Sequence, residues 1–371
     1  MVEWSPQQDE ALLSVAKWLK DKDGPQVFRL FGWAGTGKTT LAKHFAEAAG
    51  IDALYGAFTG KAALVLRKKG CHGAATLHSL TYKAVEDQKT GKVEYHINPD
   101  SALAGASLLV VDEVSMVNEE LALDVLSFGM PVLVLGDPFQ LPPVGGAGYF
   151  TEAEPDVMLT EIHRQAADNP IIRMSMDVRE GRGLAPGQYG ESEVIQRYAV
   201  DADAMRSLVM DCDQVIVGKN QTRRLYNSRM RALMGTTSLT PTPGERLICL
   251  KNNRMKGLLN GGMWHVRQAT KPTPLGIVRM KVDSLDEPDF TGVDVETPQE
   301  FFQGREGELD WRARKRIDEF DFGYAITCHK SQGSSWPDVV VFDESSVFRD
   351  DAPRWLYTAV TRAEDKVTVV V

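Results

Sequence analysis

The residues VFRLFGWAGTGKTTLAKHFAEAA, numbers 27–49, predict a β-strand, a glycine-rich loop and a helix in direct succession. The loop GWAGTGKT at 32–39 matches G-x-x-x-x-G-K-[ST], the pattern of a P-loop. Glycines leave room for backbone N–H groups to converge on phosphate oxygens, and the start of the helix adds positive potential. The stretch therefore predicts a nucleotide site that uses ATP and Mg²⁺. Its expected ligands are Gly35, Thr36, Gly37, Lys38, Thr39 and Thr40, with Lys38 on the β- and γ-phosphates and Thr39 on the metal.

Short apolar runs alternate with helical patterns along most of the chain. Continuous apolarity, rather than alternation, is what a parallel sheet covered by helices requires. A first series of runs predicts a doubly wound α/β domain over 1–165, and a second series predicts another over 166–238 and 319–371. The predicted strands are 27–31, 53–58, 107–113, 131–137, 214–218, 322–327, 339–342 and 367–371, and the predicted helices are 38–49, 60–69 and 221–234.

Two segments interrupt this alternation. Residues 82–99, with the turn Thr90-Gly91, predict a β-hairpin inserted in the first domain. Residues 239–318 contain prolines, glycines and short β-like runs, which predict a small barrel inserted in the second domain. The length of 371 residues allows all these parts, because chains of this size ordinarily form more than one core.

Composition and charge exclude several classes of protein. No run of about 18 apolar residues occurs and no signal-peptide pattern opens the chain, so we expect a cytoplasmic protein without a membrane partner. The four cysteines form no C-x-x-C pair, which argues against zinc and disulfides. The net charge of −9 comes from residues 283–310, which hold ten acids and one base, so the rest of the chain can still bind nucleic acid. Basic clusters at 67–69 and 219–231 fit either such a contact or a solvated helix face.

Acidic and amide side chains follow the next predicted strands. Asp112 and Glu113 end the strand at 107–113, at the edge of the sheet where the P-loop lies. Asp112 is expected to hold Mg²⁺, usually through water, and Glu113 to orient and deprotonate the attacking water. The same pair can be the solvent-exposed end of a strand, but the P-loop favours the functional interpretation. Gln140, after the strand at 131–137, is expected to contact the γ-phosphate.

The motifs, taken in order, resemble those of superfamily 1 helicases and, within them, the RecD- and Dda-like group, superfamily 1B. The resemblance covers nearly the whole chain, and DEVSM, QLPPV and HKSQG are its most specific parts. The matching stretches are SPQQDEA (5–11), GWAGTGKT (32–39), FTGKAA (58–63), TLHSL (76–80), VVDEVSM (110–116), GDPFQLPPV (136–144), IHRQ (162–165), TCHKSQGSS (327–335) and YTAVTRA (357–363).

This resemblance implies two RecA-like domains with ATP in the cleft between them and single-stranded DNA across both. It implies that Gln8 reads the adenine and that Gly333 lies near the nucleotide. Arg164 and Arg362 resemble arginine fingers, which stabilise the charge of the phosphoryl-transfer transition state. The chain departs from the family two residues after Gly333, where many relatives have a Glu near the ribose and this sequence has Ser335.

On the DNA side, the resemblance assigns the hairpin at 82–99 and an SH3-like barrel at 239–318 to the insertions of this branch. Tyr95 on the hairpin is expected either to pack against its domain or to stack on a base at the fork, with His96 as the reserve candidate. Helix starts and hydroxyls give a grip independent of base sequence. The expected contacts to single-stranded DNA are Thr59, Lys61, His78, His329, Lys330 and Ser331.

The predicted function is that of an ATP-dependent DNA helicase that translocates 5′→3′ on single-stranded DNA and unwinds duplex DNA at a fork. The polarity rests on the resemblance alone. We expect a monomer in a bacterial or phage-infected cell, with a single-strand-binding or replication or recombination protein as a further partner. Two alternatives are a helicase subunit of a recombination or repair complex, and an ATP-gated remodeller that binds single strands without robust unwinding.

Overall fold

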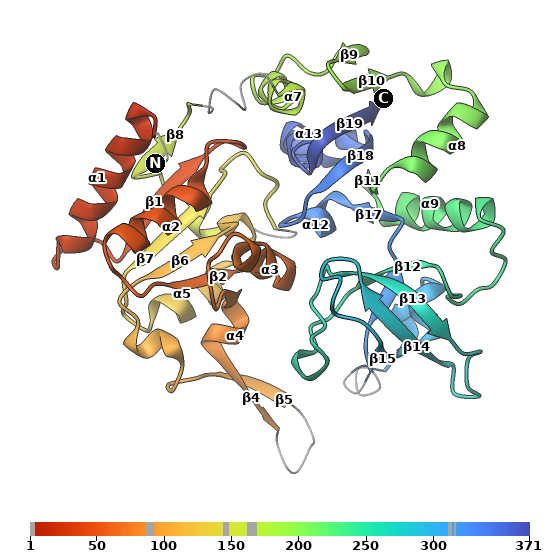
Figure 1. Cartoon of the computed structure of the whole chain (residues 1–371), viewed down its shortest axis with the longest axis horizontal. Coiled ribbons are helices and arrows are strands. Elements are labelled where there is room, and N and C mark those ends of the chain that lie inside the picture. Colours follow the sequence, from red (N-terminus) through yellow and green to blue (C-terminus); the bar gives the residue numbers. More distant parts are fainter. Residues whose placement is uncertain (1–3, 87–92, 144–147, 162–168, 311–313, 315–316) are drawn as a thin grey trace. The chain divides into compact units, whose positions relative to one another are not determined.

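The chain forms two compact units, Met1–Arg173 and Met174–Val371 (Figure 1). Among the described residues, no helix combines the length and the hydropathy that crossing a lipid bilayer needs. The computed structural model describes residues 4–86, 93–143, 148–161, 169–310, 314 and 317–371.

The first unit is built on a six-stranded parallel sheet in the order β3-β2-β6-β7-β1-β8. Leu30 and Leu133 pack into the core on one face of this sheet, while their neighbours Phe31 and Val134 pack into the core on the other. Both faces are therefore buried, which explains the continuous apolar runs. The strands are β1 Val27–Gly32, β2 Leu54–Ala57, β3 Ala75–Thr76, β6 Leu109–Asp112, β7 Val132–Gly136 and β8 Val157–Leu159, and the helices are α1 Pro6–Lys20, α2 Lys38–Ala48, α3 Gly60–Lys68, α4 Leu77–Thr81 and α5 Glu119–Leu126.

The hairpin predicted at 82–99 is present as two paired strands, β4 (Tyr82–Glu86) and β5 (Val93–Ile97). Their antiparallel register sets Tyr82 opposite Ile97 and Ala84 opposite Tyr95. The two strands form a sheet of their own that extends from α4 (Figure 1). The predicted turn Thr90-Gly91 lies outside the described residues.

The second unit contains a six-stranded sheet in the order β17-β11-β18-β19-β10-β9. All neighbours are parallel except the edge strand β9, which is antiparallel to β10. The strands are β9 Gly187–Tyr189, β10 Ser192–Ile195, β11 Gln214–Val217, β17 Ala325–Thr327, β18 Trp336–Phe342 and β19 Ala363–Val370, and the helices are α8 Ala202–Asp211, α9 Asn220–Leu233, α12 Cys328–Ser331 and α13 Ala352–Val360. Helix α7, Pro170–Arg179, spans the boundary between the two units.

Between α9 and β17 the chain forms a five-stranded antiparallel sheet in the order β15-β14-β13-β12-β16. Its described residues fall largely in the segment predicted to be an inserted barrel, and the SH3-like classification stays a prediction. The strands are β12 Arg246–Cys249, β13 Met263–Ala269, β14 Ile277–Ser284, β15 Val293–Pro298 and β16 Phe320–Phe322, and the short helix α10 is Gln299–Phe302.

The single strand predicted at 322–327 is wrong, because the chain changes sheets within it. β16 pairs with β12 in the antiparallel sheet, and β17 pairs with β11 in the parallel sheet. The crossing occurs at Gly323, where a Cβ would lie 2.9 Å from the backbone carbon of Leu247. An apolar run has the same composition in either sheet, so periodicity alone does not reveal the crossing.

Two buried amides fasten this crossing. Asn227 of α9 donates to the carbonyls of Phe322 (3.2 Å) and Ala325 (3.0 Å) and accepts from the N–H of Ala325 (2.8 Å). Gln214 of β11 donates to the carbonyls of Gly323 and Tyr324 at 3.3 and 3.0 Å. The residues between the two sheets are therefore held on both sides by side chains of the second unit.

The parallel strands of the two units follow the same plan. Reading each sheet from one edge, β3, β2, β6, β7 and β1 of the first unit correspond in position to β17, β11, β18, β19 and β10 of the second. The correspondence also holds along the chain, since both sets occur in the same sequence order. The predicted mixed α/β fold with a parallel sheet is confirmed.

Candidate active site and nucleic-acid contacts

The P-loop lies between β1 and α2, and its backbone depends on glycine. Gly35 and Gly37 have φ angles of +80° and +78°, which side-chain-bearing residues adopt rarely. A Cβ at Gly32 would lie 2.6 Å from Oγ1 of Thr36 and 2.8 Å from Cβ of Leu159. The three glycines of the motif are thus required by backbone conformation or by space.

Lys38 begins α2 with its ammonium folded over the loop. Its Nζ donates to the carbonyls of Gly32 (2.7 Å) and Trp33 (3.0 Å). Thr36 is fully buried and its hydroxyl also donates to Trp33, at 2.9 Å. The hydrogen bonds of Lys38 and Thr36 therefore stabilise the conformation of the loop. The Lys38 ammonium supplies the positive charge that phosphate binding needs.

Thr39 and Asp112 meet at the carboxyl end of the sheet. Oγ1 of Thr39 donates to Oδ2 of Asp112 at 2.7 Å, and Oδ1 of Asp112 accepts from the N–H of Glu113 at 2.8 Å. A hydroxyl and one carboxylate fit Mg²⁺, which is usually held by one or two carboxylates, waters and substrate phosphates. Among the described residues no cluster of three or more His, Cys, Asp or Glu side chains forms a metal cage.

Glu113 has a left-handed backbone, with φ +55° and ψ +48°. Such a conformation costs about 1–3 kcal/mol for a non-glycine residue and is concentrated at functional sites. Nearby, the hydroxyl of Ser115 donates to Oε1 of Gln140 at 3.4 Å, and Gln140 and Asp137 are both buried. The sequence indicated Glu113 and Gln140 but not the link through Ser115, which joins the two motifs that follow β6 and β7.

Gln8 connects the first helix to the P-loop. Its side-chain carbonyl accepts from the N–H of Ser5 at 3.0 Å in a capping box, and its Nε2 donates to the carbonyl of Thr36 at 3.1 Å. The residue is 3% exposed, so α1 is fastened to the loop through a buried amide. Gln7, which the sequence did not indicate, links α1 instead to the residues after β8, since its side-chain carbonyl accepts from the N–H of Thr160 at 2.8 Å. Two adjacent glutamines in the first turn of a helix were the available signal.

The predicted DNA contacts of the first unit lie at the ends of β2 and β3. The hydroxyl of Thr59 caps α3 by accepting from the N–H of Ala62 at 3.1 Å, and Lys61 is buried, at 7% exposure. His78 is exposed, but the protein packed against its ring lowers its pKa by desolvation, so the imidazole is neutral at pH 7. Tyr95 is 71% exposed on the hairpin, which contradicts the alternative in which it packs against its domain.

The predicted DNA contacts of the second unit lie on α12. Desolvation by the surrounding protein lowers the pKa of His329 and also that of Lys330, although Lys330 still reaches solvent. Ser331 is fully buried and its hydroxyl donates to the carbonyl of Cys328 at 2.7 Å. A direct contact between this hydroxyl and a phosphate does not fit that burial, so Ser331 contributes to the shape of α12.

Arg362 follows α13 and is 6% exposed. Its guanidinium donates to the carbonyls of Thr358 (3.0 Å) and Ser334 (3.3 Å) and to the hydroxyl of Thr361 (3.2 Å). These bonds tie it to the segment of Gly333, whose φ is +74°. Arg164, the other predicted finger, lies outside the described residues.

Ser335, the departure from the family pattern, has a carboxylate beside it. Its hydroxyl donates to Oε1 of Glu364, which lies 29 positions further along the chain. A carboxylate is therefore present next to residue 335, but it belongs to Glu364 of β19 and not to residue 335 itself. No spacing rule in the sequence relates these two residues, so only the pairing of β18 with β19 reveals the contact.

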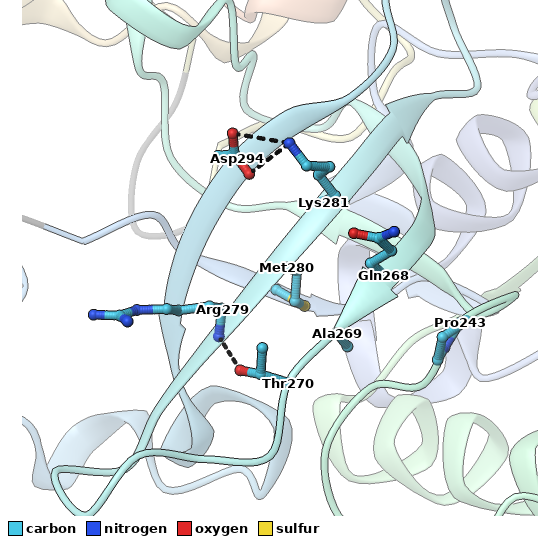
Figure 2. A pocket seen from close by; sticks show the side chains of 8 residues that line it. All are labelled: Pro243, Gln268, Ala269, Thr270, Arg279, Met280, Lys281 and Asp294. Carbon is cyan, nitrogen blue, oxygen red and sulfur yellow. Dashed lines mark hydrogen bonds and ion pairs between the residues drawn. The ribbon is translucent and has the colours of Figure 1, made fainter.

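A shallow pocket of about 400 Å³ lies over β13 and β14 of the antiparallel sheet (Figure 2). Lys281 and Asp294 form an ion pair of 3.1 Å at one end of it, and the N–H of Arg279 donates to Thr270 at 3.3 Å. None of the described residues predicted from sequence to act in the site lines this pocket. The charged side chains at its wall are already paired, Lys281 with Asp294 and Arg279 with Glu296.

Two proteins that are named as DNA helicases are similar to the chain. The ATP-dependent RecD2 DNA helicase of Deinococcus radiodurans is 30% identical over 92% of the chain and 46% of the relative. The ATP-dependent DNA helicase dda of Enterobacteria phage T4 is 34% identical over 47% of the chain and 42% of the relative. The chain thus spans less than half the length of these two relatives.

Family models match both ends of the chain, an AAA domain over residues 3–199 and a UvrD-like helicase C-terminal domain over 322–370. The chain belongs to the AAA-domain family, in the superfamily 1B helicase group. The superfamily 1B resemblance read from the motifs is therefore confirmed. The superfamily 1B fold also matches a Bacteroides Pif1 helicase crystallised with ADP-AlF3 and ssDNA, with TM-score 0.60, 19% identity and coverage of 99% of this chain and 92% of that one.

Proposed function

We propose that this superfamily 1B chain is an ATP-dependent DNA helicase that translocates 5′→3′ on single-stranded DNA and unwinds duplex DNA. The hydrogen bond between Thr39 and Asp112 carries the proposal, because it joins the P-loop hydroxyl to the strand carboxylate that together suit Mg²⁺. Relatives named as DNA helicases support the choice of DNA as the substrate. The proposed direction rests on the family resemblance.

In the proposed hydrolysis, the residues of the P-loop and those at the strand ends have different roles. Lys38 and the loop N–H groups hold the phosphates, while Glu113 orients the attacking water and takes its proton. Mg²⁺ bound at Thr39 and Asp112 would neutralise charge on the β- and γ-phosphates. Gln140, linked to Ser115, is suited to sense the γ-phosphate. Arg362 and Arg164 are proposed to stabilise the transition state, and Gln8 to contact the base of the nucleotide.

The proposed DNA partners are a single strand and a duplex fork. Thr59, Lys61, His78 and His329 are the proposed single-strand contacts, and Lys330 adds charge next to His329. A monomer in the cytoplasm, acting with a single-strand-binding or recombination protein, is part of the same proposal. The exposed Tyr95 is proposed to stand at the fork.

Duplexes with a 5′ or a 3′ single-stranded tail test the function and its direction. The purified chain with ATP and Mg²⁺ is expected to unwind the 5′-tailed duplex and to leave the 3′-tailed one paired, as followed by release of a labelled strand. Equal unwinding of both would overturn the polarity. DNA-stimulated ATP hydrolysis without strand release would favour the ATP-gated remodeller instead.

Tyr95→Ala is expected to lower the unwinding rate by about ten-fold while DNA-stimulated ATP hydrolysis persists. A stacked aromatic ring contributes about 1–3 kcal/mol per base, and about 1.4 kcal/mol is ten-fold. Tyr198→Ala is the matched control, since Tyr198 is 83% exposed in the other unit. Parallel loss of both activities in the Tyr95 variant, or equal loss in the control, would remove Tyr95 from the fork.

A further inference from the structure

The corresponding strands of the two units lead into the same local structure. β3 ends in Thr76 and continues into α4, and β17 ends in Thr327 and continues into α12. A histidine follows two residues after each threonine, as His78 and His329. Both strands are the outermost ones at the corresponding edge of their sheets. The two histidines are therefore equivalent positions of a duplicated plan.

In the first unit, two aromatic rings hold His78. The ring of Phe58 lies 5.9 Å from its ring at an angle of 67°, and the ring of Tyr82 lies 5.8 Å away at 48°. Tyr82 is itself fixed, because its hydroxyl donates to Oδ2 of Asp124 at 2.6 Å. The imidazole is therefore flanked by Phe58, which follows β2, and by Tyr82, which begins β4.

In the second unit, the ring of Phe348 packs against the imidazole of His329. Phe348 lies 5.9 Å from the ring of His329 and stacks on Trp355 at 5.6 Å and 17°. On a third side it meets Gly218, where a Cβ would lie 3.0 Å from the Phe348 ring. Trp355 also contacts α12 directly, since its carbonyl accepts from Sγ of Cys328. Phe348 thus fills the space between α12, α13 and the end of β11.

The turn that carries Phe348, Ser345–Asp351, is anchored where it begins. The carboxylate of Glu344 accepts from the N–H groups of Gly218 and Lys219, both at 2.9 Å, and from the hydroxyl of Thr222 at 2.6 Å. One residue after Phe348, Arg349 has φ +52° and ψ −115°, a conformation that a non-glycine residue keeps only when its surroundings enforce it. The turn therefore presents Phe348 in one defined position.

We propose that Phe348 is a positioning residue that holds the imidazole of His329 for a hydrogen bond to a phosphate of single-stranded DNA, as Phe58 and Tyr82 hold His78 in the first unit. This inference rests on the proposed function. A braced imidazole donates an N–H from a fixed direction, so less freedom is lost when the phosphate binds. Burial lowers the pKa of both histidines, which suits a neutral donor in each unit.

Single-stranded DNA affinity, measured by fluorescence anisotropy with labelled oligothymidine, tests the inference. Phe348→Leu is expected to weaken binding by about ten-fold, the scale of one hydrogen bond, and Phe348→Tyr is expected to restore it because the ring is retained. Combining Phe348→Leu with His329→Ala should weaken binding no further than His329→Ala alone, since the ring acts through the histidine. Val347→Ala, a half-exposed neighbour in the same turn, is the control.

The binding results of the Phe348 and His329 variants distinguish a failure of the positioning role from a failure of the proposed helicase function. If His329→Ala weakens binding but Phe348→Leu does not, the positioning role is overturned while the DNA contact remains. Additive losses in the double variant, or no rescue by Phe348→Tyr at an unchanged melting temperature, also overturn it. If neither single variant weakens binding, both the positioning role of Phe348 and the DNA contact at His329 are overturned. Strand release from the 5′-tailed duplex by the unaltered chain decides the helicase function separately.

Discussion

Lys38→Ala is expected to lower ATP turnover by about 10³-fold, while single-stranded DNA affinity changes by less than about three-fold. The lysine supplies the positive charge at the P-loop, where its Nζ already lies on the carbonyls of Gly32 and Trp33. None of the proposed DNA contacts involves this loop, so the effect should fall on hydrolysis alone. Phosphate release and oligothymidine anisotropy on the same preparation measure the two quantities.

Lys43→Ala is the matched control for this prediction. Lys43 lies on the same helix, pairs with Glu47 at 3.6 Å and donates to the carbonyl of Lys69 at 3.1 Å, away from the loop. Its removal should leave turnover within about two-fold, as is usual for surface positions. Turnover of the Lys38 variant within a few-fold of the unaltered chain would overturn the nucleotide site.

Arg362→Ala is expected to lower kcat by about 10³-fold with a smaller effect on nucleotide affinity, because an arginine finger acts mainly on the transition state. The same result is expected for Arg164→Ala. Arg362 also makes three hydrogen bonds within its own unit, so the alanine variant should lose about 1–3 kcal/mol of stability as well. Single-turnover hydrolysis and nucleotide titration distinguish the two effects.

Arg362→Lys separates chemistry from stability, since lysine keeps the charge but lacks the planar fork of donors. We expect kcat to remain low in this variant while the melting temperature recovers part of its loss. If kcat follows the melting temperature in both variants, Arg362 is a structural residue. A weakened nucleotide affinity with unchanged kcat would instead make it a binding residue.

Much of the fold could be predicted because buried parallel strands leave a direct signal. The runs around Leu30, Val111 and Val134 are apolar on both faces, and each became a strand near its predicted bounds. The crossing at Gly323 could not be predicted, because a strand that leaves one sheet for another keeps the same apolar composition. The edge strand β9 also left no signal, since its residues are exposed or half-exposed.

The parts of the candidate site that could be predicted are those whose residues lie within one motif or at the ends of neighbouring strands. The P-loop and the pair Thr39–Asp112 follow from strands that end at the same edge of a sheet. Contacts between distant segments were missed, as with Ser335 and Glu364, because no local pattern relates the two residues. The burial of Ser331 was missed for the same reason, since its motif specifies a serine without specifying which way the side chain faces.

The crossing between β16 and β17 has a mechanical consequence. Only Gly323 and Tyr324 separate the last strand of the antiparallel sheet from the strand that leads into α12. Asn227 and Gln214 hydrogen-bond to both ends of that short connection, which restricts its conformation. We therefore expect a displacement of the antiparallel sheet to move the helix that carries His329.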